Sequence, residues 1–441
     1  MTYNIIIGRN QPDRELFGDK GIVYLGKLYV TMGQHTSLSN PVYMDVTRPH
    51  VVMIAGKRGS GKSYSGSVIA EEISRLPSEI KDKMTVLFFD TMGIFWTMRY
   101  PNTRQEELLR QWNLEPEGMK INVFTPKGFF DEYRKKGVPA DYRFALKTSE
   151  LDAGDWCEVF GVALTEPIGI FVERLISQAH EEMGEYSIRD LLTLIKTDAK
   201  AEKSVRDAAE NRFFAAEQWG LFDKEGTTIE QLMKPGSVNV LDISAYTNVA
   251  GNWSIKGLVI GLICRKLLQE RITARKEEEL EDIKRQKSYF YEEKGIEKPM
   301  VWIMIDEVHE FLSKEGKTPA TDALVQLLRE GRQPGISLVL VTQQPGEIHK
   351  DVLTQSDIVL SHRLTAKADI EALNSMMQSY LVTDLQTYLN SLPKVKGASI
   401  ILDDNSERIY PVGIHPKRSW HGGEAPSAIP LKKEFAFEVK G

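Results

Sequence analysis

The residues best suited to chemistry form a glycine-rich octet that matches G-x-x-x-x-G-K-[ST] at every fixed position. Its members are Gly56, Lys57, Arg58, Gly59, Ser60, Gly61, Lys62 and Ser63. The glycines let backbone N–H groups close around a phosphate chain. Lys62 supplies the ammonium for the β and γ phosphates, and Ser63 supplies the hydroxyl that holds Mg²⁺. The octet is therefore predicted to bind ATP and Mg²⁺.

A second constellation follows the apolar run 301–305, where Asp306 and Glu307 stand side by side. In a nucleotide hydrolase, the first such carboxylate holds Mg²⁺ and the second orients or deprotonates the attacking water. The same pair would be a weak signal in isolation. Downstream of the octet it predicts a metal role for Asp306 and a catalytic role for Glu307, with Lys62.

Two further polar residues end apolar runs. Gln343 follows the run 336–342, where it can sense the γ-phosphate, although a satisfied polar residue at a strand end remains the alternative. Asp90 ends the run 84–90. A place near the nucleotide or a subunit contact, and a plain cap of the following turn, explain Asp90 equally well.

These residues must be positioned by strands that alternate with helices. The runs 51–55, 84–90, 121–124, 237–243, 301–305 and 336–342 are mostly apolar, as in buried parallel strands. Such alternation predicts an α/β fold with a doubly wound, mostly parallel sheet. Ligands of these sheets bind beyond the carboxyl ends of the strands, where the polar residues above are expected.

Pattern changes divide the chain into five parts. We expect a short β module at 1–49, the first part of the nucleotide-binding core at 50–128, a helical insertion at 129–235, the second part of the core at 236–414, and an extended tail at 415–441. The β module is too short to be stable alone, so it must pack on the core or on a neighbouring subunit.

The composition is that of an ordinary globular protein: 441 residues, 41% hydrophobic and 27% charged, with a net charge of −6. No apolar run is long enough to span a membrane and the first residues lack a signal-peptide pattern, so we expect a cytoplasmic protein without a membrane partner. Cys157 and Cys264 have no metal-ligand spacing and are expected to be buried.

The acidic net charge means that any DNA contact must be local. One basic segment, 134–147, interleaves lysine and arginine with aromatic residues. A solvated charged face explains that segment more often than a nucleic-acid surface does. Lys350, Lys394 and Lys396 are the other contact candidates.

Together the motifs resemble the HerA-like branch of the HerA/FtsK P-loop ATPases. The resemblance covers most of the chain. It rests on the octet and on six further segments: 151–156, 240–244, 304–312, 328–332, 338–345 and 417–424.

The resemblance implies a RecA-like core in a homo-hexameric ring with DNA, expected to be double-stranded, in the pore. It also implies that an arginine from one subunit completes the next subunit's ATP site, and Arg332 matches that arginine. A nuclease or other effector is the implied partner. The chain departs from the family at Pro49, which separates Arg48 from His50, at Ile94 after Gly93, and in its shortened barrel-like β module.

Two functions follow. The first is a ring motor that hydrolyses ATP to translocate on DNA, a helicase or translocase for repair or defence. The second is a regulatory or scaffolding ATPase ring that switches an effector without processive translocation. The presence of Glu307 favours ATP hydrolysis under either function.

Overall fold

The computed structural model describes residues 3–32, 35–249, 251–287, 298–376 and 385–424. The strands in these ranges are β1 (Ile5–Ile7), β2 (Ile22–Met32), β3 (His35–Asp45), β4 (Val51–Ala55), β5 (Met84–Asp90), β6 (Asn122–Pro126), β7 (Tyr142–Phe144), β8 (Leu146–Lys147), β9 (Phe222–Asp223), β10 (Val238–Asp242), β11 (Met300–Ile305), β12 (Ile336–Thr342), β13 (Ile358–His362), β14 (Ala398–Asp403) and β15 (Arg408–Ile414).

The α-helices in the same ranges are α1 (Gln11–Phe17), α2 (Lys62–Ser74), α3 (Ser78–Lys81), α4 (Glu106–Gln111), α5 (Lys127–Lys135), α6 (Ala153–Phe160), α7 (Pro167–Met183), α8 (Ile188–Thr197), α9 (Lys203–Gln218), α10 (Ile229–Leu232), α11 (Asn252–Lys287), α12 (Thr321–Glu330), α13 (Lys350–Gln355), α14 (Lys367–Met376) and α15 (Leu385–Ser391).

One large sheet organises the molecule. Within the described residues its strand order is β1-β3-β2-β15-β14-β13-β4-β12-β11-β5-β10-β6-β7. The half from β13 to β7 is parallel, and β13, β14, β15, β2 and β3 pair in antiparallel fashion one after another. The predicted α/β class with a mostly parallel core sheet is confirmed.

The strand register brings the polar strand ends together. Ala55 pairs with Thr342, and Ile305 pairs with both Leu340 and Phe89. The residues that follow β4, β12 and β11 therefore emerge side by side at the carboxyl edge. Sequence segments nearly 300 residues apart form one site for this reason.

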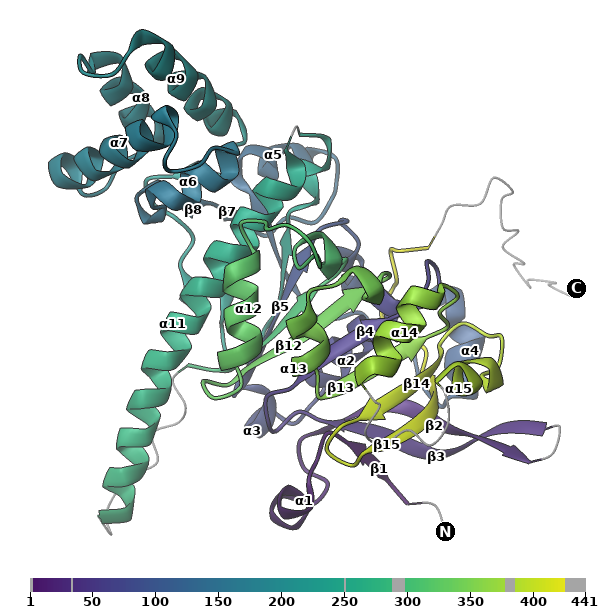
Figure 1. Cartoon of the computed structure of the whole chain (residues 1–441). Helices are drawn as coiled ribbons and strands as arrows, with labels where there is room; N and C mark the ends of the chain where they lie inside the picture. The colour runs from purple at the N-terminus through teal and green to yellow at the C-terminus, as the bar shows by residue number, and fades with distance from the viewer. Residues whose placement is uncertain (1–2, 33–34, 250, 288–297, 377–384, 425–441) are drawn as a thin grey trace, which may run out of the picture.

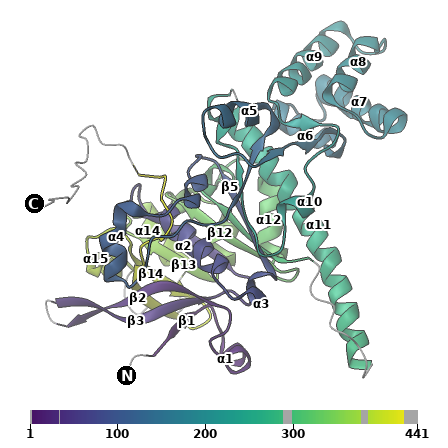
Figure 2. The ribbon, with the colours of Figure 1, turned by 180° about the vertical axis from the view of Figure 1, so that it is seen from behind.

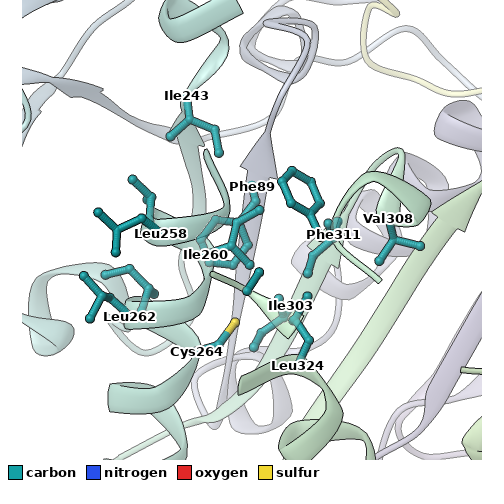
Figure 3. Packing of buried hydrophobic residues seen from close by; sticks show 14 of the residues in the cluster. Phe89, Ile243, Leu258, Ile260, Leu262, Cys264, Ile303, Val308, Phe311 and Leu324 are labelled. Carbon is teal, nitrogen blue, oxygen red and sulfur yellow. The ribbon is translucent and has the colours of Figure 1, made fainter. Parts of the chain in front are cut away.

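Helices cover both faces of the parallel half. Figure 1 shows α12, α13 and α14 on one face, and Figure 2 shows α2 and α3 on the other. The first half of α11 packs Leu258 and Cys264 into a buried cluster with Phe89, Ile303 and Leu324 (Figure 3). Strands and helices both contribute apolar side chains to this cluster. The cluster therefore holds α11 and α12 against the parallel half of the sheet.

The two cysteines are buried, as expected, and the described residues contain no disulfide between them. Burial raises the pKa of the Cys264 thiol. None of the described helices combines the length and the apolar character needed to cross a membrane.

The N-terminal β module differs from the shortened barrel that the sequence suggested. Its strands continue the large sheet: Leu28 of β2 pairs with Val412 of β15, β3 pairs with β2, and β1 pairs with β3. The module is too small to close on itself, and the edge of β15 offers unpaired backbone groups that β2 satisfies.

A buried charge network fastens this module to the core. His50, just before β4, contacts Asp357 through Nδ1 at 2.7 Å and Asp45 of β3 through Nε2 at 3.4 Å. Arg9 pairs with the same Asp45. Arg48, separated from His50 by Pro49, instead pairs with Asp13 of α1 at 2.8 Å.

The helical insertion is confined to a lobe of α6 to α9 that stands clear of the sheet (Figure 1). The long helices of this lobe are α7, α8 and α9, within the segment 129–235 that was expected to be a helical insertion. The flanking parts of 129–235 instead join the core, because β7 extends the sheet beside β6.

The long helix α11 follows β10 in the chain, and its far half extends away from the core in Figure 1. Residues 288–297, which follow this helix, lie outside the described residues. So does the end of the predicted tail, 425–441.

Candidate nucleotide site

The glycine-rich octet forms the turn between β4 and α2. Gly59 and Gly61 have φ values of 74° and 109°, a region that disfavours side-chain-bearing residues. Gly61 is the N-cap of α2, and no side chain caps the helix. The free N–H groups of the first turn therefore point into the loop, which is the arrangement that binds phosphate.

Lys62 is held at the loop with its side chain largely enclosed, at 6% exposure. Its Nζ donates to the Lys57 carbonyl at 3.3 Å. Burial lowers the pKa of Lys62, and the charges of Glu307 and Asp306 oppose that shift. An ammonium with one weak protein hydrogen bond is available for an anionic ligand.

Asp306, at the end of β11, is nearly fully buried. Burial raises the pKa of this carboxyl, and a hydrogen bond from the Ser63 hydroxyl counteracts the rise. The structure thus brings together the two oxygen groups that the sequence assigned to a metal.

These donors fit Mg²⁺, which prefers oxygen ligands and binds through one or two protein groups, waters and substrate phosphates. In the described part of the chain, no three His, Cys, Asp or Glu side chains converge on a metal position. A Mg²⁺ ion at Ser63 and Asp306 would therefore depend on the nucleotide for further ligands.

Glu307 adopts the left-handed backbone conformation, with φ 52° and ψ 43°. Its Oε2 is buried and has no hydrogen-bond partner. Burial and then the neighbouring Asp306 raise the pKa of Glu307 to about 7, with Lys62 opposing. A carboxylate with a free oxygen and a pKa near neutrality suits a general base.

Gln343 lies beside Glu307, as its position after β12 predicted. Its Nε2 donates to Glu307 Oε1 at a long 3.4 Å. The structure therefore gathers Lys62, Ser63, Asp306, Glu307 and Gln343 at one edge of the sheet. Lys57 and Arg58 are exposed on the rim of the octet.

Arg332 is not part of this group. It is exposed in the connection between α12 and β12, at the amino end of β12. Gln343 follows the other end of that seven-residue strand, roughly 20 Å away at about 3.3 Å per residue. Arg332 cannot reach the phosphates bound by its own subunit.

Asp90 caps the turn that follows β5, one of its two expected roles. Its Oδ1 accepts from the backbone N–H groups of Gly93 and Ile94 at 2.7 and 3.1 Å, and Oδ2 accepts from Phe95 at 2.8 Å. Burial and the neighbouring Asp242 raise the pKa of Asp90 to about 7.

Sequence reasoning missed His362, which contacts Ser65 of α2, two residues after the octet. This residue ends β13 and is fully buried. Its Nδ1 lies 3.1 Å from the Ala398 carbonyl, so Nδ1 carries the proton, and Nε2 accepts from the Ser65 hydroxyl at 2.9 Å. Burial lowers the pKa of His362 to about 4, which keeps the ring neutral. A polar residue ending the strand next to β4 was the available signal.

Sequence reasoning also missed His309 as a neighbour of Glu307. Its Nδ1 lies 3.6 Å from Glu307 Oε2 and 3.3 Å from Thr342 Oγ1. Burial lowers the pKa of His309. The imidazole lies close to the Glu307 carboxylate. Because its lowered pKa keeps the ring uncharged at neutral pH, it does not neutralise the carboxylate charge.

The tail up to residue 424 forms a strap across α2. Glu71 accepts hydrogen bonds from the backbone of Arg418 at 2.8 Å and Ser419 at 3.0 Å, and from Ser419 Oγ at 2.6 Å. The hydroxyl of Tyr64, the residue after Ser63, accepts from the backbone of Lys417. The strap thus fixes the helix that carries Lys62 and Ser63.

Several cations of the basic segment are paired within the chain. Arg143 contacts Asp131 at 3.0 Å, Lys136 contacts Glu132 at 2.6 Å, and Lys147 pairs with Glu185. These pairs favour the solvated-face interpretation. Lys350 begins α13, whereas Lys394 and Lys396 lie in the connection between α15 and β14, beside the octet.

Comparison with known proteins agrees with this geometry. The family model described as "Helicase HerA, central domain" matches residues 23–267. A second model, zonular occludens toxin, matches residues 254–384.

Two curated relatives are described as DNA double-strand break repair helicase HerA. The protein from Saccharolobus solfataricus is 26% identical over 313 residues, covering 69% of this chain and 52% of the relative. The protein from Sulfurisphaera tokodaii is 23% identical over 355 residues, covering 79% and 60%. The chain thus spans about half the length of the curated relatives it matches.

Among solved structures, VirB4 of Thermoanaerobacter pseudethanolicus superposes with a TM-score of 0.53 at 12% identity, covering 90% of this chain and 97% of that one. This similarity concerns the fold, which is that of a RecA-like P-loop ATPase. With more than half of its residues matched by the family model, the chain belongs to the HerA helicase central-domain family of P-loop ATPases.

Proposed function

We propose that this chain is the motor subunit of a ring that hydrolyses ATP to move along DNA. The observation that carries the proposal is the free, buried oxygen of Glu307 beside Lys62, Asp306 and Gln343. A protein that binds the nucleotide without hydrolysing it has no need for such a base. Membership of the HerA family supports DNA as the track.

In the proposed reaction, the N–H groups of α2 and the Lys62 ammonium bind the β and γ phosphates. Ser63 and Asp306 would hold Mg²⁺, which neutralises phosphate charge when bound. Glu307 takes a proton from water as the water oxygen bonds to the γ-phosphorus and the bond to the β–γ bridging oxygen breaks. Gln343 contacts Glu307 and reports the loss of phosphate through β12.

The subunits would assemble as a homo-hexamer. Arg332 is remote from its own site and exposed, so it is free to complete the site of a neighbour. A ring also repeats each subunit's few cations six times around the pore, which turns a modest basic patch into a multi-phosphate contact. A nuclease or another effector in repair or defence is the proposed partner.

The test is ATP turnover with no DNA and with linear duplex, single-stranded or forked DNA, in a preparation shown to be hexameric. We expect duplex DNA to raise the rate, and DNA binding to weaken steeply with salt because phosphate contacts release counterions. Glu307→Gln is the matched control and should stay inactive with every DNA. Equal rates across all DNAs would support a scaffolding ATPase ring instead.

A further inference from the structure

The connection that carries Arg332 is short and has a packed base. It spans residues 331–335, between the end of α12 and the start of β12. Its backbone turns back on itself, because the Gly335 N–H donates to the Arg332 carbonyl at 3.3 Å. Arg332 and Gln333 are exposed at the tip, whereas Pro334 and Gly335 are buried at the base.

The guanidinium of Arg332 has no partner in its own subunit. No described residue gives it a hydrogen bond, an ion pair or a ring contact. A guanidinium with free donors suits an anionic ligand such as a phosphate. Since no side chain orients it, the direction of Arg332 depends on the backbone of the connection and on the groups that hold that backbone in place.

Arg271 of α11 holds the base of the connection. Its Nε donates to the Pro334 carbonyl at 2.8 Å. Its Nη1 donates to the carbonyl of Lys298, just before β11, at 2.6 Å and to Glu278 Oε1 at 3.1 Å. α11 lies alongside α12, the helix that leads into the connection (Figure 1). One guanidinium therefore joins α11, the start of β11 and the connection before β12.

The contact between Arg271 and the connection leaves no spare room. The side chain of Arg271 is only 2% exposed, so water cannot replace the hydrogen bonds that it makes. Gly335 has a φ of 89°, and a Cβ at this position would lie 3.1 Å from Arg271 Nη2 and 3.1 Å from Met300 Cγ. A shift of the Arg271 guanidinium would therefore shift the base of the connection.

Arg9 provides a matched comparison elsewhere in the chain. It is also 2% exposed, it donates to the carbonyls of Gly18 and Lys20 at 2.6 and 2.8 Å, and it pairs with Asp45. The chemistry is that of Arg271, but these contacts fasten the N-terminal strands. Loss of Arg9 therefore reports the effect of removing a buried arginine without touching the connection.

We infer that Arg271 is a positioning residue for Arg332, which it holds in the place from which Arg332 reaches the ATP of the neighbouring subunit. This role rests on the proposed function and adds the residue that sets the direction of the arginine. Because Arg271 is buried, it acts only through the connection. Its loss should slow hydrolysis at the neighbour's site and leave nucleotide binding by its own octet intact.

The first measurement compares turnover and Mg–ADP affinity in hexameric preparations. Arg271→Met keeps the apolar stem and removes the donors. We expect turnover to fall about 10²-fold, the usual cost of misplacing a group by about 1 Å. Mg–ADP affinity, measured by calorimetry, should stay within about two-fold of wild type because the octet is untouched. Gly335→Ala, which crowds Arg271 instead of removing it, should have the same two effects, whereas Arg9→Met should keep wild-type turnover.

The second measurement mixes variant subunits, which separates action on the neighbour from action on the subunit's own site. Arg271→Met mixed with Lys62→Ala should regain part of the activity, since an intact octet then meets a correctly held Arg332 at some interfaces. Arg271→Met mixed with Arg332→Ala should regain none, because neither subunit supplies that arginine correctly. A role in its own site would give the opposite pattern.

Wild-type turnover by Arg271→Met and Gly335→Ala, with Arg332→Ala inactive, would refute the positioning role and leave the proposed function standing. Recovery in any pattern other than with Lys62→Ala alone would also overturn the role. Full turnover by Arg332→Ala would refute the arginine shared between subunits, and the positioning role with it. If Arg271→Met does not fold, as judged by its melting transition, Gly335→Ala takes its place in both measurements.

Discussion

At the residue scale, Glu307 shows how backbone geometry serves chemistry. A glutamate at φ 52° holds a conformation that L residues seldom adopt, and such strain persists where the surroundings enforce it. In this position Gln343 contacts one carboxylate oxygen of Glu307, and the other oxygen has no hydrogen-bond partner.

The contrast between Lys62 and Glu307 is the first prediction. Lys62→Ala should abolish turnover by removing a phosphate contact, whereas Glu307→Gln should leave ATP bound but reduce turnover by about 10² to 10⁴, the usual contribution of a general base. Nucleotide affinity and single-turnover hydrolysis distinguish the two. Wild-type turnover by Glu307→Gln would show that the Asp306–Glu307 pair has been misassigned.

The second prediction concerns His362, which is expected to stabilise the fold around the octet rather than to take part in catalysis. In His362→Ala, the Ser65 hydroxyl and the Ala398 carbonyl lose their partners, at a cost of about 1 to 3 kcal/mol per buried group left unsatisfied. We expect a lower free energy of unfolding and weaker ATP binding, measured by denaturation and calorimetry.

His362→Gln offers a donor and an acceptor on one side chain and should recover part of both losses. Ile170→Ala, at an exposed position of α7, is the control. Unchanged ATP affinity in His362→Ala would mean that the octet keeps its shape without this support.

At the element scale, the junction between the N-terminal strands and the core depends on His50. Burial alone would lower the pKa of His50, but hydrogen bonds to Asp357 and Asp45 outweigh it and raise the pKa to about 9. The folded protein therefore keeps this proton between pH 6.5 and 9, whereas the unfolded chain releases it near 6.5.

The stability that His50 supplies is thus complete below pH 6.5 and lost as the pH rises toward 9. The difference in unfolding free energy between wild type and His50→Gln should shrink by about 3 kcal/mol over that range, from about 1.4 kcal/mol per pKa unit. Denaturant titrations at pH 6.5, 7.5 and 9 measure it, with the exposed Ile170→Ala as the control. A difference independent of pH would mean that His50 is neutral in the folded state.

The strap predicts a second element-level effect. Glu71→Ala removes the acceptor of three hydrogen bonds that join α2 to residues 418–419. Because hydrogen bonds to a charged group contribute about 1.5 to 3 kcal/mol each, we expect a loss of several kcal/mol and faster proteolysis after residue 415.

Glu79→Ala on the exposed helix α3 is the matched control for the strap and should behave as wild type. Proteolysis of Glu71→Ala at the wild-type rate would show that other contacts hold the strap.

At the scale of the whole molecule, one chain cannot complete the proposed site, because Arg332 lies at the far edge of its own sheet. Mixing Arg332→Ala with Lys62→Ala subunits should restore part of the ATPase activity, since some interfaces then pair an intact octet with an intact arginine. Such arginines are worth about 10³ to 10⁵ in rate. No recovery at any ratio in confirmed mixed rings, or full activity in a monomer, would exclude action across the interface.

The sequence by itself determined the octet, the Asp306–Glu307 pair, Gln343 and the parallel strands that carry them. These features are local: a glycine turn, an apolar run and its polar end can be recognised within a few residues, and parallel strands bring their ends to one edge. The helices of the lobe were readable for the same reason.

The tertiary structure alone decided what depends on distant partners. The N-terminal strands join β15 because their edge needs hydrogen bonds, a fact that no local pattern encodes. His362 acquires its role from Ser65, almost 300 residues earlier, and Arg143 and Lys147 of the segment 134–147 are paired by the carboxylates of Asp131 and Glu185. The burial, hydrogen-bond partners and charge neutralisation of a residue depend on its neighbours in space. Neighbours that are distant in the sequence come close only once the chain has folded.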